Sequence, residues 1–420
     1  MGDGTARHVS SLVAIGAFAV VTSLFFAWGF ISANTDPLIA ALRAIFTLTY
    51  TEAILTQIIF FLAYGAVSLP AAGVMRRVGP VSAILIALII MMLGCLTVQA
   101  VTRFHNYSFI LAALFILGSG ITMLQVAANP LAASLGPPER SHFRLTFAQA
   151  FNSLGVVLGA HYGSRLMLGD IAFTSDNFIA DAGGKALALE AVSRAFLIIA
   201  MCIAGLAVLI FVMRGRIAGA AKVMEEERGA VFDALRSRWA IAGAATIAAY
   251  VGAEVAIAAL MINFLAQPQI LALPLAVAGQ YLANFYWGGA LVGRFIGSFL
   301  LTRVAAAKLL LFCAVMAAAL CVIVVTSNGE IAAYAALAIG LFNSIMFPTI
   351  FTISLEKSGV APSATSGLLC LAIVGGALLP LMAGRVADTL GLNSAFVVPM
   401  LGYAIVLAFS SVAVRSKSRA

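Results

Sequence analysis

The chain is built from long apolar runs separated by short polar stretches. Each run approaches or exceeds the roughly 20 residues that a helix needs to cross the hydrocarbon core of a bilayer. Lipid offers no partner for open backbone groups, so runs of this length are predicted to be helices. The ten-residue alternation of a transmembrane β-barrel is absent. The predicted spans are 13–36, 50–75, 80–101, 107–135, 143–168, 191–213, 239–265, 280–302, 308–326, 331–355, 363–386 and 393–413.

Composition agrees with this pattern, since 63% of the 420 residues are hydrophobic and only 10% are charged. A soluble domain of this size needs a far more charged surface. The first apolar run is too long for the core of a signal peptide and is predicted to be an uncleaved span. The sequence therefore predicts an all-α membrane protein with twelve transmembrane helices.

The net charge of +8 has two explanations, nucleic-acid binding and membrane topology. The positions of the charges favour topology. With the N-terminus in the cytoplasm, most Lys and Arg residues fall on the cytoplasmic side, as the positive-inside rule requires. We therefore predict that both termini are cytoplasmic. The basic residues on the other side are Arg43, Arg103, Arg165, Lys185, Arg194 and Arg385.

The longest charged stretch, 214–238, divides the spans into two sets of six. We predict an N-terminal six-helix bundle over 1–214, a cytoplasmic linker over 215–238 and a C-terminal six-helix bundle over 239–420. The linker is interpreted as a solvated connection, with a regulatory role as the alternative. Weak echoes about 220 residues apart, such as AANPL in 127–131 and MFPTI in 346–350, indicate two parallel repeats, a known transporter architecture.

Three charged residues fall at or near membrane depth, where a charge is costly and is a functional candidate by default. Asp36 precedes Pro37 at the end of the first span, and it either takes up a proton or cation, binds sugar hydroxyls, or lies in the outer interface. Glu254 lies well inside the seventh span. Arg294 in the eighth span either pairs with an acid or extends to the cytoplasmic surface, and we favour a structural role for it.

Uncharged amides form two pairs at helical spacing: Gln125 with Asn129, and Gln149 with Asn152. Amides donate and accept hydrogen bonds, which suits the hydroxyl groups of a neutral sugar. The alternative is that they tie helices together; we favour the pocket. Further candidates are Gln57 and Tyr64 in the second span, Asn284 and Trp287 in the eighth, Asn343 in the tenth, and Trp28, whose ring is suited to stack on a pyranose or to pack against lipid.

Several classes of function are excluded by missing motifs. The chain has no phosphate-binding GxxxxGK[ST] loop, no HExxH and no plausible catalytic triad. Its histidines are not clustered, and its five cysteines lie in apolar spans and are expected to be buried free thiols. We expect no enzyme activity, no cofactor, no metal, no nucleic acid and no obligate protein partner. A soluble output domain, as in a membrane sensor, is also absent.

Seven blocks of the sequence resemble a known family. FFAWGFISANTDPL, QVAANPLAASLGPPE, RLTFAQAFNSLG, YVGAEV, FYWGGALVGRFIGS, AIGLFNSIMFPTIF and GLLCLAIVGGALLP are similar to the glucose/galactose branch of the fucose:proton symporter family, within the major facilitator superfamily. The resemblance runs from about residue 24 to 410. It implies twelve helices in two bundles, alternating access and cation-coupled hexose uptake across a bacterial inner membrane.

The same resemblance assigns roles to single residues. Asp36 matches the family's first-span acid, which is implicated in proton coupling and sugar binding. Gln125 stands where fucose permeases have a fourth-span glutamate, as in the glucose/galactose branch, so either Glu254 takes the second acidic role or the chain uses another cation or none. Arg76 occupies the position of the superfamily's usual aspartate between the second and third helices.

Together these observations predict a secondary transporter that imports glucose or galactose, with a proton as coupling ion carried by Asp36 and Glu254. The alternatives are another sugar such as L-fucose or N-acetylglucosamine, and sodium-coupled or uncoupled transport. A metabolite or drug exporter and a non-transporting membrane sensor are more remote.

Overall fold

The computed structural model describes residues 2–34, 50–104, 107–168, 182–220 and 230–416. These residues form helices with short connections, and no strand occurs among them, which confirms the all-α prediction. The chain divides into two compact units. The first contains residues 1–131 and 151–226, and the second contains 132–150 and 227–420. The division into six-helix bundles over 1–214 and 239–420 stays a prediction. The compact units differ from it at residues 132–150, which belong to the second unit.

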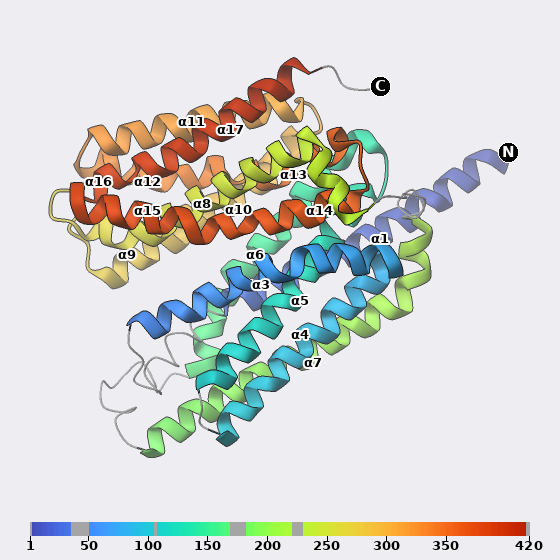
Figure 1. Cartoon of the computed structure of the whole chain (residues 1–420), viewed down its shortest axis with the longest axis horizontal. Helices are drawn as coiled ribbons and strands as arrows, with labels where there is room; N and C mark the ends of the chain where they lie inside the picture. The colour runs from blue at the N-terminus through green and yellow to red at the C-terminus, as the bar shows by residue number, and fades with distance from the viewer. Residues whose placement is uncertain (1, 35–49, 105–106, 169–181, 221–229, 417–420) are drawn as a thin grey trace. The chain divides into compact units, whose positions relative to one another are not determined.

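The first unit is built from long, continuous helices (Figure 1). α4 packs along α7, which also contacts α1, and α3 packs against α4. Pro70 in α3 and Pro130 in α5 lie inside helices, a placement that neighbouring helices make tolerable in membrane proteins. The helices of this half are α1 (Gly2–Ala33), α3 (Tyr50–Val78), α4 (Pro80–Phe104), α5 (Tyr107–Ser134), α6 (Ser141–Leu168) and α7 (Ala182–Ala220), with a short turn η1 (Pro138–Arg140) before α6.

The second unit has more interruptions along its helices. α8 packs against α13, α15 and α17, and α11 packs against α12 and α17. A π-helical turn, η4, joins α9 to α10. The elements are η3 (Val231–Arg236), α8 (Arg238–Ala266), α9 (Leu275–Tyr281), η4 (Leu282–Trp287), α10 (Gly288–Leu300), α11 (Ala306–Thr326), α12 (Gly329–Asn343), α13 (Met346–Ser358), α14 (Pro362–Leu371), η5 (Ala372–Val374), α15 (Gly375–Leu390), α16 (Leu392–Ala395) and α17 (Val397–Arg415).

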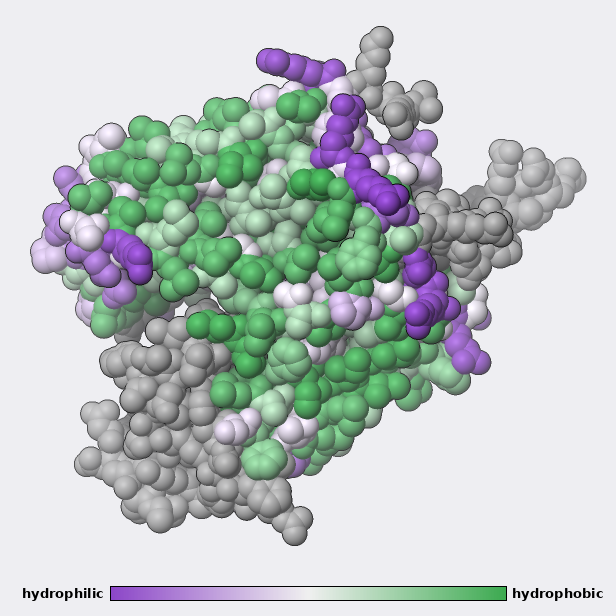
Figure 2. Space-filling view, viewed as in Figure 1, coloured by the Kyte–Doolittle hydropathy of each residue, from purple (hydrophilic) through white to green (hydrophobic). Residues whose placement is uncertain are grey.

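Every predicted span coincides with a helix or with a run of consecutive helices. By length and apolar composition alone, 10 stretches of the described residues qualify as membrane spans. The predicted spans 143–168 and 280–302 are outside that set. The run from α9 to α10 is divided by η4. Figure 2 shows apolar surface along the sides of the helices and hydrophilic residues gathered towards their ends.

The two units repeat one close helix contact. A Cβ atom added at Gly155 in α6 would collide with the carbonyl oxygen of Phe26 in α1, and one added at Gly375 in α15 would collide with that of Ala248 in α8. Only glycine lets two helix backbones approach so closely. Because both partners of the second contact lie about 220 residues after those of the first, this geometry supports the internal repeat suggested by the sequence.

All five cysteines are free, and four of them are buried as expected. Cys202 is the exception, since it is exposed on α7. Its neighbours Met201 and Val208 are also exposed, so this face of α7 is an apolar surface suited to lipid. The expectation of burial was wrong there because a membrane helix can present apolar residues outward.

Candidate functional site

In the first unit, Gln125 and Asn129 occupy one face of α5 and are both buried. The side-chain amide of Gln125 donates a hydrogen bond to the hydroxyl of Tyr64 in α3. The helical spacing of the two amides places both on one buried face of α5, as expected, and Gln125 contacts the candidate Tyr64. Their role in a sugar pocket stays a prediction.

Within the first unit, Asn152 connects α6 to α1. Its Nδ2 donates to the carbonyl oxygen of Phe25 at 3.1 Å. The helices approach closely here, because a Cβ atom at Gly29 would collide with the backbone carbonyl of Asn152. Trp28, buried beside this contact, lies 5.2 Å from the ring of Phe25. Asn152 thus contributes to helix packing, and its role as a sugar ligand stays a prediction.

The second unit holds a connected polar network around Glu254 in α8. Tyr250, one turn earlier, donates to Oε1 of Glu254 at 2.8 Å, and its hydroxyl also lies 3.0 Å from the carbonyl oxygen of Asn343. Tyr286 in η4 donates to the backbone carbonyl of Glu254 at 3.2 Å and accepts from Nδ2 of Asn343 at 3.1 Å. Three elements, α8, η4 and the end of α12, therefore meet at one acid.

This network can accept either protonation state of Glu254. The Tyr250 hydroxyl has one hydrogen and two acceptors within reach, Glu254 Oε1 and Asn343 O. When Glu254 is ionised, Tyr250 donates to its carboxylate. When Glu254 is protonated, the acid donates to the Tyr250 oxygen, and Tyr250 turns its hydrogen to Asn343. A proton can enter or leave with the rotation of one hydroxyl.

Arg294 in α10 donates to backbone carbonyl groups of two other helical segments. Its Nε donates to the carbonyl oxygen of Ser344 at 3.1 Å, and its Nη1 reaches the carbonyl oxygen of Gln149 at 3.5 Å. Gln149 itself is buried. Arg294 thus connects α10 with the end of α12 and with the first half of α6, and sequence reasoning had favoured a structural role for it.

The remaining candidates are more scattered. Asp36 lies outside the described residues, and Gln57 lies in α3 at a position whose side chain is likewise outside them. Asn284 is exposed and Trp287 is partly buried in the π-helical turn. A π turn has more residues than an α turn, so the two residues do not share a face as an i, i+3 pair would in a regular helix.

Tyr286 is a site residue that sequence reasoning missed, although a signal for it exists. Tyr64 and Tyr286 are separated by 222 residues, as are Phe26 and Ala248 of the repeated helix contact. Each tyrosine hydroxyl accepts a hydrogen bond from an amide, Gln125 for Tyr64 and Asn343 for Tyr286. Aligning the halves by this separation would have identified the second tyrosine.

Among the described residues, no three His, Cys, Asp or Glu side chains come together as a metal site. The polar groups present are amides, hydroxyls and one acid with a nearby arginine. Such groups can hydrogen-bond a neutral polyhydroxylated molecule and can bind or release a proton. Helical units with polar residues and an acid within their spans are typical of secondary transporters.

Comparison with known proteins gives the family. The sequence profile of the Major Facilitator Superfamily matches residues 13–368. A glucose/galactose transporter of Brucella abortus (biovar 1, strain 9-941) is 40% identical over 405 residues, which make up 95% of this chain and 94% of that protein. An L-fucose-proton symporter of Escherichia coli K12 is 28% identical, over 94% of this chain and 92% of that protein. The chain belongs to the Major Facilitator Superfamily.

Solved structures agree with this assignment. The Major Facilitator Superfamily transporter FucP, in its outward conformation, matches with a TM-score of 0.86 and 26% identity, covering 96% of this chain and all of that one. The predicted twelve-helix fold and the resemblance to the glucose/galactose and fucose transporters are therefore confirmed. Because its relatives are transporters, the prediction that the chain is not an enzyme is confirmed as well.

Proposed function

We propose that this protein imports a neutral hexose, glucose or galactose, in symport with a proton. The observation that carries the substrate class is the 40% identity to a glucose/galactose transporter over nearly the full length of both chains. Buried amides support it, because Gln125, Asn129 and Asn343 offer hydrogen bonds without a fixed charge, as sugar hydroxyls require.

For proton coupling we propose Glu254 together with Asp36. Glu254 supports this role through its Tyr250 partner, since the shared hydroxyl hydrogen satisfies both the ionised and the neutral acid. Proton binding and release at Glu254 change the net charge inside the second unit by one. The Escherichia coli relative is an L-fucose-proton symporter, which supports the same ion.

We further propose an inner-membrane location with both termini in the cytoplasm, and six-helix bundles over 1–214 and 239–420 joined by the 215–238 linker. The excess of Lys and Arg on one side of the predicted spans supports the orientation. The repeated glycine contact between Gly155 and Phe26, and between Gly375 and Ala248, supports the two bundles.

The direct test is uptake of labelled sugars by the purified protein in proteoliposomes. Glucose, galactose, L-fucose and N-acetylglucosamine are each supplied with an imposed pH gradient or an imposed sodium gradient. We expect glucose or galactose to accumulate with the pH gradient alone. Accumulation of L-fucose or N-acetylglucosamine instead would reassign the substrate, and uptake that follows only sodium would reassign the coupling ion.

A further inference from the structure

The short helix η3, which comes directly before α8, has three distinct faces. It is a 3-10 helix of six residues, and in such a helix side chains three residues apart lie one above the other. Ala234 is 1% exposed and marks the face that packs within the second unit, where η3 contacts α8 and α14. Phe232 and Leu235 form the second face, and Asp233 and Arg236 form the third.

The apolar face of η3 is exposed. Phe232 is 64% exposed and Leu235 is 53% exposed. The next helix, α8, qualifies as a membrane span by length and composition, and Ile241 in its first turn is exposed as well. Exposed apolar side chains thus continue from η3 into a helix whose surroundings are lipid.

Two basic residues lie at the same end of α8. Arg238 is exposed at the start of that helix, and Lys357 at the end of α13 has its Nζ 5.2 Å from the centroid of the Trp239 ring. Ser237 donates from Oγ to the carbonyl oxygen of Ser358 at 2.7 Å. The residue before Arg238 and the residue after Lys357 are therefore in contact, which brings the two basic residues to one place beside the end of η3.

Trp239 indicates the depth of this place in the membrane. Its ring meets Phe409 of α17 edge-on, with the ring centroids 5.8 Å apart. Tryptophan is enriched at the boundary between membrane and water, where its ring lies at the level of the lipid headgroups. Because the Lys357 ammonium lies over this ring, it is at the level of the lipid phosphates.

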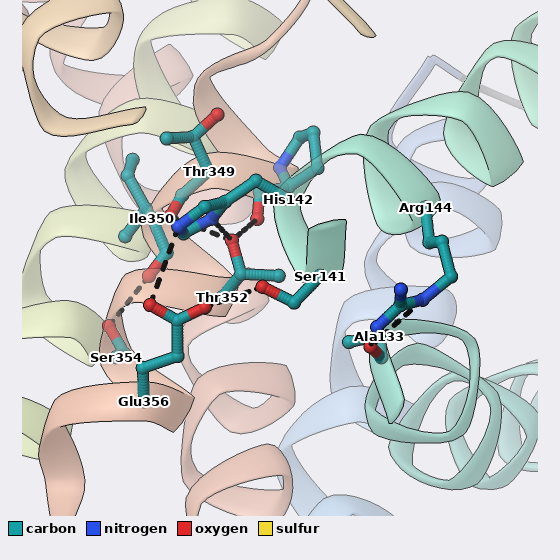
Figure 3. Close-up of polar contacts among 10 residues, drawn as sticks. Ala133, Ser141, His142, Arg144, Thr349, Ile350, Thr352, Ser354 and Glu356 are labelled. Carbon is teal, nitrogen blue, oxygen red and sulfur yellow. Dashed lines mark hydrogen bonds and ion pairs between the residues drawn. The ribbon is translucent and has the colours of Figure 1, made fainter. Parts of the chain in front are cut away.

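The acid next to Lys357 has other partners. Glu356 points to the start of α6 (Figure 3). Its Oε1 accepts a hydrogen bond from Ser141, and its Oε2 lies 3.4 Å from Nε2 of His142. The negative charge of Glu356 is thus engaged on the side of α13 that faces α6, and it forms no ion pair with Lys357.

The acid of η3 is engaged as well. Oδ2 of Asp233 accepts from the backbone N–H of Ala230 at 2.6 Å, and its Oδ1 lies 3.8 Å from Nη1 of Arg236. Asp233 therefore offsets the charge of Arg236 on their shared face. Among the described residues, neither Arg238 nor Lys357 forms an ion pair with a carboxylate.

A bilayer that contains acidic lipids matches both halves of this surface. The boundary layer of the membrane covers apolar side chains of a surface helix, and the phosphate oxygens of an acidic lipid accept hydrogen bonds from arginine and lysine. A soluble anion would leave Phe232 and Leu235 in water. A bilayer of neutral lipids would leave Arg238 and Lys357 without a partner that carries a net negative charge.

We propose that Phe232, Leu235, Arg238 and Lys357 form a binding site for an acidic membrane lipid, which we call the anchor. Phe232 and Leu235 lie in the boundary layer of the bilayer, and Arg238 and Lys357 bind the phosphate group of the lipid. On the predicted topology the anchor is in the cytoplasmic leaflet. It holds the end of the 215–238 linker against the membrane, and it depends on neither the sugar nor the coupling ion.

The test places a fluorescent reporter on the apolar face of η3. Leu235→Cys in a Cys202→Ala background, which removes the exposed native thiol, is labelled with bimane in the full-length protein. The protein is reconstituted into bilayers of equal parts phosphatidylglycerol and phosphatidylcholine, with one of the two lipids brominated on its acyl chains. Quenching by each brominated lipid gives the local preference for the acidic one, and quenching by iodide reports exposure to water.

We expect brominated lipid to quench the reporter and iodide to leave it unquenched. Phosphatidylglycerol should be preferred roughly tenfold or more, as expected for two basic residues at an acidic surface. Arg238→Gln combined with Lys357→Gln should lower this preference to about one. Arg238→Lys combined with Lys357→Arg keeps both charges and should keep the preference. Phe232→Ser should make the reporter accessible to iodide.

The matched control is Arg303→Gln combined with Lys308→Gln. Both residues are exposed and basic, they belong to the second unit, and they lie on the same side of the membrane in the predicted topology. This pair removes the same amount of charge from another place, so it should leave the preference for phosphatidylglycerol at Leu235 unchanged.

Three results would overturn the anchor. Quenching by iodide alone would place η3 in water. Quenching by neither agent would mean that protein, either another segment of this chain or a second copy, covers the face. A preference that falls equally in the control pair would show general attraction to surface charge in place of a site. No sugar is used in this experiment, so its failure leaves the proposed transport function standing.

Discussion

Replacing Glu254 by glutamine is expected to uncouple transport while leaving the protein folded. Glutamine keeps the length of the side chain and one oxygen that can accept from Tyr250, as Oε1 of Glu254 does at 2.8 Å. It cannot ionise. Arg294 keeps the Ser344 carbonyl at 3.1 Å as an acceptor, so the arginine is not left without a partner when the carboxylate is removed.

The magnitude follows from the coupling arithmetic. A gradient of one pH unit is worth about 1.4 kcal/mol per proton, so it supports an accumulation of about tenfold for one proton per sugar. Glu254→Gln should lower this ratio to about one, which is the value for equilibration without a driving ion. The lost or altered hydrogen bonds to Tyr250 should cost only about 0.5–1.5 kcal/mol of stability.

Two assays on the same proteoliposomes separate coupling from binding. Accumulation under a pH gradient measures coupling, whereas counterflow of labelled sugar needs no net proton movement and should survive in Glu254→Gln. The matched control is Glu330→Gln, because Glu330 is exposed in the first turn of α12, and it should accumulate sugar normally. Tenfold accumulation by Glu254→Gln would refute the coupling role, and loss of counterflow as well would make Glu254 a sugar ligand.

Three further predictions address other parts of the molecule. Asp36→Asn should lose accumulation but keep counterflow, and normal accumulation would exclude Asp36 from coupling. Asn152→Ala should raise the KM for sugar about tenfold, equivalent to about 1.4 kcal/mol, without loss of abundance; normal affinity in this variant and in Gln149→Ala would argue against the amide pocket. Gly155→Leu should lower the free energy of unfolding in detergent by about 1–3 kcal/mol, because the larger side chain overpacks against α1. Gly205→Leu should leave it unchanged, because nothing lies within 4 Å of a Cβ atom at that position.

The sequence predicted the helices well because lipid imposes a strong length and composition signal. The run around Glu254, for example, was predicted as 239–265 and is observed as Arg238–Ala266. Interruptions were not predicted. The π turn at 282–287 places an extra residue in one turn of the helix. Apolar periodicity carries no information on such an insertion.

The sequence identified some residues of the candidate site and missed others, for a physical reason. Helical spacing identifies residues on one face, so the buried pair Gln125 and Asn129 could be recognised from the sequence. Partners on distant helices could not. Asn343 contacts Tyr286, which is 57 residues away in the sequence, and His142 contacts Glu356, which is 214 residues away. Both contacts form only when the helices pack.

The repeat also explains why the two halves are expected to contribute differently to coupling. The tyrosine–amide contact occurs in both units, at Tyr64 and Tyr286, so it is a symmetric feature suited to positioning polar groups. The acids are not symmetric. At the same separation of 222 residues, the counterpart of Glu254 is Ser32, and Asp36 lies four residues further along the sequence. Acids at inequivalent positions of the repeat are expected to bind a proton with different affinities, whereas the two members of a symmetric pair would be equivalent.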